Sequence, residues 1–129
     1  MTILDKKNII GVSALLVHAA RIDEIYSEQE KNLIKSFIKS YLKSESSDTI
    51  LKEAEEIEKN SNQLLNFTNI IKKNSMEVKI DILEHLWKII ISDKTIDQYE
   101  SNLMRRICGL IYVPDKMCAE VKLKLLNSK

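Results

Sequence analysis

Apolar residues return along this chain at the spacing of α-helices. The clearest stripe occupies positions i, i+1, i+4, i+5, i+8 and i+9, namely Leu33, Ile34, Phe37, Ile38, Tyr41 and Leu42. One face of a helix presents residues at these intervals, whereas a strand alternates every second residue. Two other segments, 4–22 and 75–91, are apolar nearly all round, which predicts buried, central helices. Shorter stripes predict four further helices, after breaks near residues 46, 61, 96 and 113.

The polar breaks between the stripes carry helix-start signals. Ser27 followed by Glu30 has the spacing of a capping box, and Asp97 followed by Glu100 repeats it. Further starts are expected at Ser47 or Asp48, after Asn74-Ser75, and at Pro114, which suits a first helical turn. The 129 residues include two glycines and one proline, too few for many hairpins. The sequence therefore predicts an all-α fold of about seven helices.

One segment of the chain recurs 70 residues later. Residues 16–33 align with 86–103, and Leu, Asp, Glu, Asn and Leu stand at matching places in both copies. Such self-similarity predicts a repeated structural unit. We expect a single domain over residues 1–129, with pseudo-twofold units at about 4–59 and 75–127 and a bridging helix at about 62–73.

The two units are expected to pack through their most apolar helices, the first and the fifth. On this hypothesis the small residues of the first helix accept Trp87 and the isoleucines that follow it. The small residues are Gly11, Ala14, Ala19 and Ala20.

The composition and net charge of the chain argue against nucleic acid and membrane as binding partners. Apolar residues make up 44% and charged residues 30%, and the net charge is +1, so no overall field draws the chain to nucleic acid. No apolar run reaches the roughly 18 residues of a membrane span. The run at 9–20 imitates a signal peptide, but its counterpart at 79–90 makes it part of the fold. We expect a cytoplasmic protein with a protein partner, no nucleic acid and no membrane insertion.

Catalytic arrangements are missing from the sequence. His18 and His85 lie in apolar helices, where a hydrogen-bonded structural role is the common one, and no Ser-His-Asp order, Cys-His pair or phosphate-cradling glycine loop can be found. Cys108 and Cys118 are expected to be reduced and partly buried, because two cysteines form neither a zinc knuckle nor a secreted disulfide framework. We expect no enzymatic activity.

The recurring acids are the candidate site. Glu30 and Glu100 fit helix capping, whereas Asp23 and Asp93 follow helix ends, where a negative charge gains nothing from the helix dipole. Carboxylates seven residues apart around a break also suit a hard divalent cation, which prefers oxygen ligands. Two interpretations stay open: a metal site at Asp23, Glu30, Asp93 and Glu100, or acids that only cap helices and order loops.

The doubled segment resembles the TerB-like (tellurite resistance protein B) family. That family's pattern is an Ala- or Leu-rich helix, Asp-Gly, a few residues, Glu and an amphipathic helix, given twice in an all-helical domain. Residues 14–30 and 86–107 carry it here. The resemblance implies a role in tellurite and other stress responses and a divalent cation at the acids.

This chain departs from that pattern at two kinds of position. Glu24 and Lys94 replace the expected glycines, and His18 and Lys88 replace a glutamate of the preceding helix. By analogy the Asp23–Glu30 pair is the stronger cation candidate, because two lysines flank Asp93. The resemblance implies a non-catalytic stress-response accessory protein; the alternative is a metal-free protein-interaction module.

Overall fold

Seven α-helices make up most of the part of the chain that the computed structural model describes, residues 5–21, 26–43, 46–60, 65–91 and 98–127, and these residues contain no strand. In chain order they are α1 (Lys6–Arg21), α2 (Glu28–Tyr41), α3 (Ser47–Asn60), α4 (Leu65–Lys72), α5 (Met76–Ile91), α6 (Gln98–Leu110) and α7 (Asp115–Asn127). The predicted all-α fold is confirmed.

Two predicted helix starts agree with the structure and two are displaced by one residue. Ser27 caps α2, and the Ser75 hydroxyl accepts the Val78 amide at 3.4 Å at the start of α5. At α3 the cap is Ser46 rather than Ser47 or Asp48, because the Ser46 carbonyl already accepts the Ile50 amide at 3.1 Å. Asp97, the expected start of the sixth helix, lies outside the described residues.

Pro114 lies just before α7 rather than in its first turn. Its carbonyl oxygen accepts the amides of Met117 at 3.0 Å and Cys118 at 3.2 Å, which makes it the cap residue. A proline can take this place because the cap contributes its carbonyl and needs no amide proton. Both displacements are of the size that helix ends commonly show.

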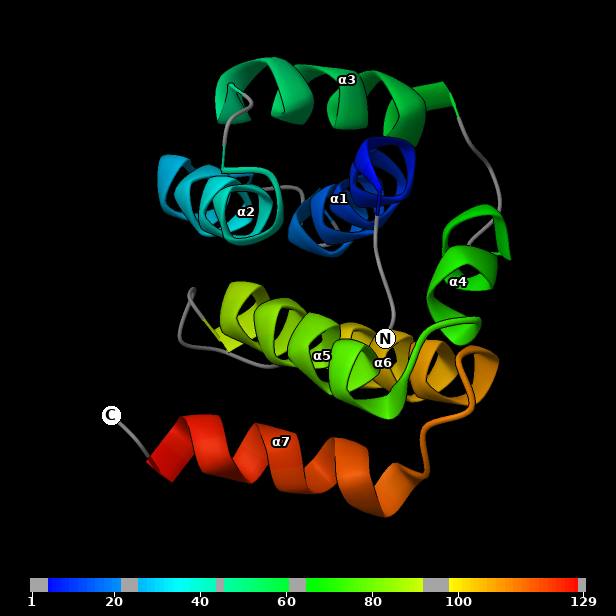
Figure 1. The fold of residues 1–129 in the computed structure, drawn as a ribbon. Coiled ribbons are helices and arrows are strands. Elements are labelled where there is room, and N and C mark those ends of the chain that lie inside the picture. The colour runs from blue at the N-terminus through cyan, green and yellow to red at the C-terminus, as the bar shows by residue number, and fades with distance from the viewer. Residues whose placement is uncertain (1–4, 22–25, 44–45, 61–64, 92–97, 128–129) are drawn as a thin grey trace.

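The helices are stacked in tiers, as Figure 1 shows. Helix α3 lies across α1 and α2, and α5 lies below that pair and above α7. Helix α4 stands at the side of the stack, where it contacts α1, α5 and α6. Each proposed unit thus has its third helix packed on its first, α3 on α1 and α7 on α5. The twofold relation between the units stays a prediction.

Helix α1 is the centre of the core. Eleven of its 16 residues are buried, because α2, α3, α4 and α5 all pack against it. Helix α5 is similar, with Ile82, Leu83, Leu86 and Ile89 fully buried. The prediction of two central helices from their all-round apolarity is therefore confirmed.

The predicted contact between these two helices is correct only in outline. Helices α1 and α5 do pack together, but Gly11 faces Ile70 of α4, whose Cδ1 would lie 2.5 Å from a Cβ added to the glycine. Lys122 of α7 covers the indole of Trp87, with its Nζ 5.3 Å from the ring centroid. A helix that is apolar all round does not reveal which neighbour each face meets, so the prediction for Gly11 was wrong.

The close approach of Ile70 to Gly11 predicts a dependence between the two residues. Gly11→Ala alone gains helix propensity of about 1 kcal/mol but displaces the Ile70 side chain, so we expect little net change. In an Ile70→Val background the blocking Cδ1 is gone, and Gly11→Ala should stabilise the fold by roughly 0.5–1 kcal/mol. Urea denaturation of the four proteins measures the difference. Gly109→Ala is the control, because nothing lies within 4 Å of its added Cβ; equal effects of Gly11→Ala in both backgrounds would contradict the contact.

Trp87 gives a second prediction. Its side chain is buried beneath α7, so Trp87→Ala should lower the free energy of unfolding by about 3–5 kcal/mol, as large aromatic deletions in cores do. The measurement is the urea midpoint, with Leu123→Ala as control because Leu123, on the covering helix α7, is 56% exposed. An unchanged midpoint in Trp87→Ala would show that the indole is not part of the core.

Candidate functional site

The acids singled out by the sequence lie at the α1–α2 and α5–α6 junctions. Asp23 and Asp93 fall outside the described residues, and Glu100 lies in the first turn of α6 without a described side chain. Glu30, in the first turn of α2, is the member of the set whose geometry is given. The α1–α2 junction is therefore the part of the predicted site whose contacts the structure describes.

Glu30 is held at the start of α2 by a complete capping box. Its Oε1 accepts the Ser27 amide at 2.8 Å and the Ser27 hydroxyl at 3.1 Å, while Ser27 Oγ accepts the Glu30 amide at 3.2 Å. The side chain is 3% exposed. A buried carboxylate is stabilised here by charge-assisted hydrogen bonds and by the positive end of the α2 dipole. The predicted capping box is confirmed.

Two acids of α3 also reach this junction. Glu55 accepts a hydrogen bond from the Tyr26 hydroxyl at 2.6 Å. Glu58 Oε1 accepts one from Arg21 at 2.9 Å, and its Oε2 lies 3.3 Å from His18 Nδ1. Sequence reasoning missed both acids, because their partners are 29 to 40 residues away. The only local feature that links Glu55 and Glu58 is their spacing of three residues, which places them on the same face of α3.

The tyrosine at this junction is a hydrogen-bond donor rather than a base. Burial raises the pKa of Tyr26 far above its ordinary value, and the hydrogen bond to Glu55 raises it further. Its ring also has Arg21 at 5.2 Å and Lys31 at 5.0 Å from the centroid. A phenol that stays protonated and a paired glutamate fix the position of α3 over the junction.

The described part of the junction therefore supplies one buried carboxylate suited to a hard cation. Carboxylate oxygens are the ligands that Ca²⁺ and Mg²⁺ prefer, and Glu30 meets that requirement. Among the residues with described side chains, no three His, Cys, Asp or Glu gather in a metal-binding group. Asp23, the other predicted ligand at this junction, lies outside the described residues.

The histidines and cysteines have structural surroundings. His85 Nδ1 lies 2.8 Å from the carbonyl oxygen of Asp81, one turn earlier, and His18 is paired with Glu58, so the predicted hydrogen-bonded roles are confirmed. Cys108 and Cys118 are buried and unbridged. A hydrogen bond with the Cys118 sulfur and burial raise the pKa of the Cys108 thiol, which keeps it protonated and unreactive.

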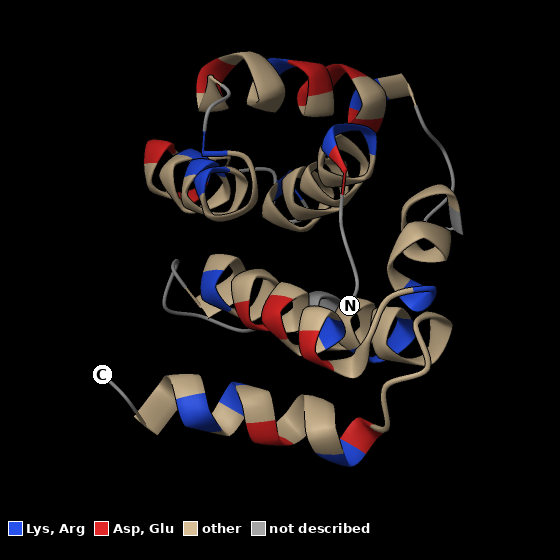
Figure 2. Ribbon diagram, viewed as in Figure 1, with Lys and Arg blue, Asp and Glu red and all other residues tan. Residues whose placement is uncertain are grey.

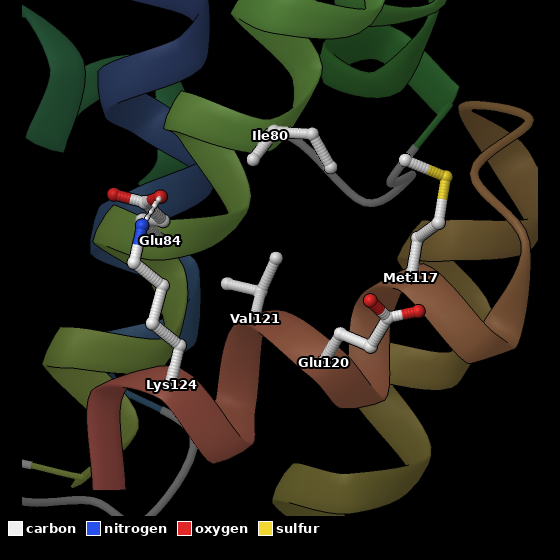
Figure 3. A pocket seen from close by; sticks show the side chains of 6 residues that line it. All are labelled: Ile80, Glu84, Met117, Glu120, Val121 and Lys124. Carbon is white, nitrogen blue, oxygen red and sulfur yellow. Dashed lines mark ion pairs between the residues drawn. The ribbon is translucent and has the colours of Figure 1, made fainter. Parts of the chain in front are cut away.

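A separate cleft lies between α5 and α7 (Figure 3). It has a volume of about 370 Å³ and is lined by Ile80, Glu84, Met117, Glu120, Val121 and Lys124. Lys124 Nζ lies 3.8 Å from Glu84 Oε1 across it. The lining holds no histidine, cysteine or serine; its titratable members are Glu84, Glu120 and Lys124.

The surface is mixed in charge, in keeping with the net charge of +1. Figure 2 shows acidic and basic residues interleaved along α3, α5 and α7. Within the described residues, no helix has both the length and the apolarity needed to cross a membrane. The absence of nucleic-acid binding and the cytoplasmic location stay predictions.

Comparison with known proteins identifies a family for this chain. No curated protein and no solved structure matches this chain. The model of the family described as "Tellurite resistance protein TerB" matches residues 10–123, from the first turns of α1 to the later turns of α7. The matched region includes both helix junctions and covers most of the sequence, so this chain belongs to the TerB family.

Proposed function

We propose that this protein is a non-catalytic accessory protein of a tellurite-resistance type stress response, and that its α1–α2 junction binds a divalent cation through Asp23 and Glu30. The observation that supports the cation site is the Glu30 carboxylate, which is 3% exposed and held in one orientation by the Ser27 amide. A preoriented carboxylate loses little freedom when it binds an ion. Family membership supports the stress-response role by analogy.

The second junction is proposed as the weaker cation site. Asp93 and Glu100 repeat the spacing of Asp23 and Glu30, but Lys94 follows Asp93 directly and Lys88 lies in the last turn of α5. Positive side chains close to a carboxylate oppose the entry of a divalent cation. At the first junction, Arg21 is already paired with Glu58, so its charge is largely balanced.

The second candidate is a metal-free protein-interaction module. The observation that favours it is the capping box, which already gives Glu30 a structural role. In this case Glu30 and Glu100 start helices, and the protein acts through a protein partner. Affinity capture with and without a chelator separates the candidates: a single stoichiometric partner retained in the chelator favours the module.

Metal addition tests the cation site directly. An ion that binds only the folded state must stabilise it, by about 2.7 kcal/mol at a hundredfold excess over Kd, or roughly 10 °C in Tm for a domain of this size. We expect Ca²⁺, Mg²⁺, Mn²⁺ or Zn²⁺ to raise the Tm of the metal-stripped protein. Asp23→Asn should remove most of the shift and Asp93→Asn less. No shift with any ion, or an equal shift in the Asp23→Asn/Asp93→Asn double variant, would rule out the site.

A pair of substitutions separates capping from cation binding. Glu30→Gln keeps an acceptor for the Ser27 amide, since Gln also serves in capping boxes, but it removes the charge. We expect it to keep the capping hydrogen bond in a weaker, uncharged form, with a modest loss of stability without metal, and to lose the metal-induced rise in Tm. Ser27→Ala removes the cap oxygen and keeps the carboxylate, so it should cost about 1 kcal/mol and retain the rise. A Glu30→Gln protein that still responds fully to metal would exclude Glu30 as a ligand.

A further inference from the structure

We propose that Lys72, Lys79 and Tyr112 form a binding site for a phosphate group, at the corner where α4 ends, α5 begins and α6 ends. Lys72 Nζ lies 5.6 Å and Lys79 Nζ 6.0 Å from the centroid of the Tyr112 ring. The corner is separate from the α1–α2 junction, and the proposal does not depend on the cation site.

Lys79 is the first unusual member of this corner. It lies in the first turn of α5 and is 7% exposed, although lysine is rarely buried without a partner. Within the described part of the chain, neither Lys79 nor Lys72 forms an ion pair with a carboxylate. Two ammonium groups thus approach one ring, and no carboxylate among the described residues forms an ion pair with either of them.

Tyr112 is the second unusual member. Its φ of 62° makes it the non-glycine residue with a left-handed backbone in the described chain. The amide of Val113 donates to the Cys108 carbonyl at 2.9 Å, and that of Tyr112 to the Gly109 carbonyl at 3.4 Å. This is the Schellman ending of a helix, whose left-handed position is usually glycine. A bulky aromatic is held here in a strained conformation, while 68% of it is exposed.

Tyr26, a second described tyrosine with cations near its ring, provides a comparison for this corner. The ring of Tyr26 also has two cations near it, Arg21 and Lys31. Both have carboxylate partners within the chain: Arg21 pairs with Glu58 at 2.9 Å and Lys31 with Glu28 at 3.8 Å. At the Tyr112 corner two cations also lie near one ring, but among the described residues neither has a carboxylate partner, so an anion from outside would complete the corner.

The chemistry of the corner favours phosphate over other anions. A phosphate group carries more charge than a carboxylate and can accept hydrogen bonds from two ammonium groups at once. The N-terminal end of α5 adds the positive end of its dipole, which stabilises phosphates at helix starts. Figure 2 shows further basic residues along α6, which is in contact with α4. The exposed ring can stack against a base, as aromatic side chains do with nucleotides.

Titration followed by amide NMR tests the site, with inorganic phosphate and AMP as probes and sodium chloride at equal ionic strength as the blank. We expect saturable shifts at the amides of Lys79, Tyr112 and Val113 with at least one probe. AMP binding more tightly than phosphate would identify a nucleotide-type ligand, and equal binding would identify the phosphate group as sufficient. No saturable shift with either probe would overturn the proposal.

Variants with matched controls locate the binding. Lys79→Met keeps the buried stem filled and removes the charge, and we expect it to raise Kd about tenfold, which corresponds to about 1.4 kcal/mol. Lys72→Met should act in the same direction. Lys39→Met, at an exposed lysine on α2, is the control and should leave Kd unchanged. Equal weakening by Lys79→Met and Lys39→Met would reduce the effect to overall charge and overturn the site.

Tyr112→Gly separates an effect on binding from an effect on folding. Glycine relieves the left-handed strain, so this variant should have a higher Tm than the parent protein. It should nevertheless bind AMP more weakly, because the ring is gone. Weaker binding by a more stable protein cannot result from unfolding. Unchanged AMP and phosphate affinities in Tyr112→Gly would show that the ring takes no part, and the proposal would be wrong.

Discussion

The structure depends on the burial of α1 on every side. A helix with apolar residues all round has no face to give to water, so it requires neighbours above, below and beside it. Helices α2, α3, α4 and α5 supply them, and α5, which is nearly as apolar, needs α7 as a cover in turn. Burial of this kind is the main favourable term in folding. The tiered stack follows from two helices that cannot lie at the surface.

This constraint also decides where polar chemistry can be placed. Helix α1 offers almost no exposed side, and α5 keeps only one charged side, so titratable groups gather there, where helices begin and end, and along the outer helices. Glu30, Tyr26 and Arg21 stand at the α1–α2 junction, and Lys72, Lys79 and Tyr112 at the corner of α4, α5 and α6. Helix ends are suited to charge because their unpaired backbone groups carry partial charges. Both candidate sites are therefore consequences of the packing and require no separate pocket.

The elements could be predicted from the sequence because their signals are local. The spacing of apolar residues located the helices, and the Ser27–Glu30 spacing located a cap that the structure confirms. The contacts between elements could not be predicted in the same way. Gly11 meets Ile70 rather than Trp87, and Glu55 and Glu58 reach partners 29 to 40 residues away. Apolar periodicity indicates which face of a helix is buried. When all faces are buried, it does not indicate which neighbouring helix each face contacts.

The net charge of the chain likewise does not predict which charged side chains are paired in the folded protein. A net charge of +1 agrees with the interleaved acidic and basic residues of α3, α5 and α7. It does not distinguish two regions that differ in whether their cations have carboxylate partners. At the α1–α2 junction the cations near Tyr26 are matched by Glu58 and Glu28. At the α4–α5–α6 corner the cations near Tyr112 are not matched within the described chain. Interactions at a few ångströms depend on this local balance and little on the total, so the distinction between the two tyrosines emerges only when the helices are placed in space.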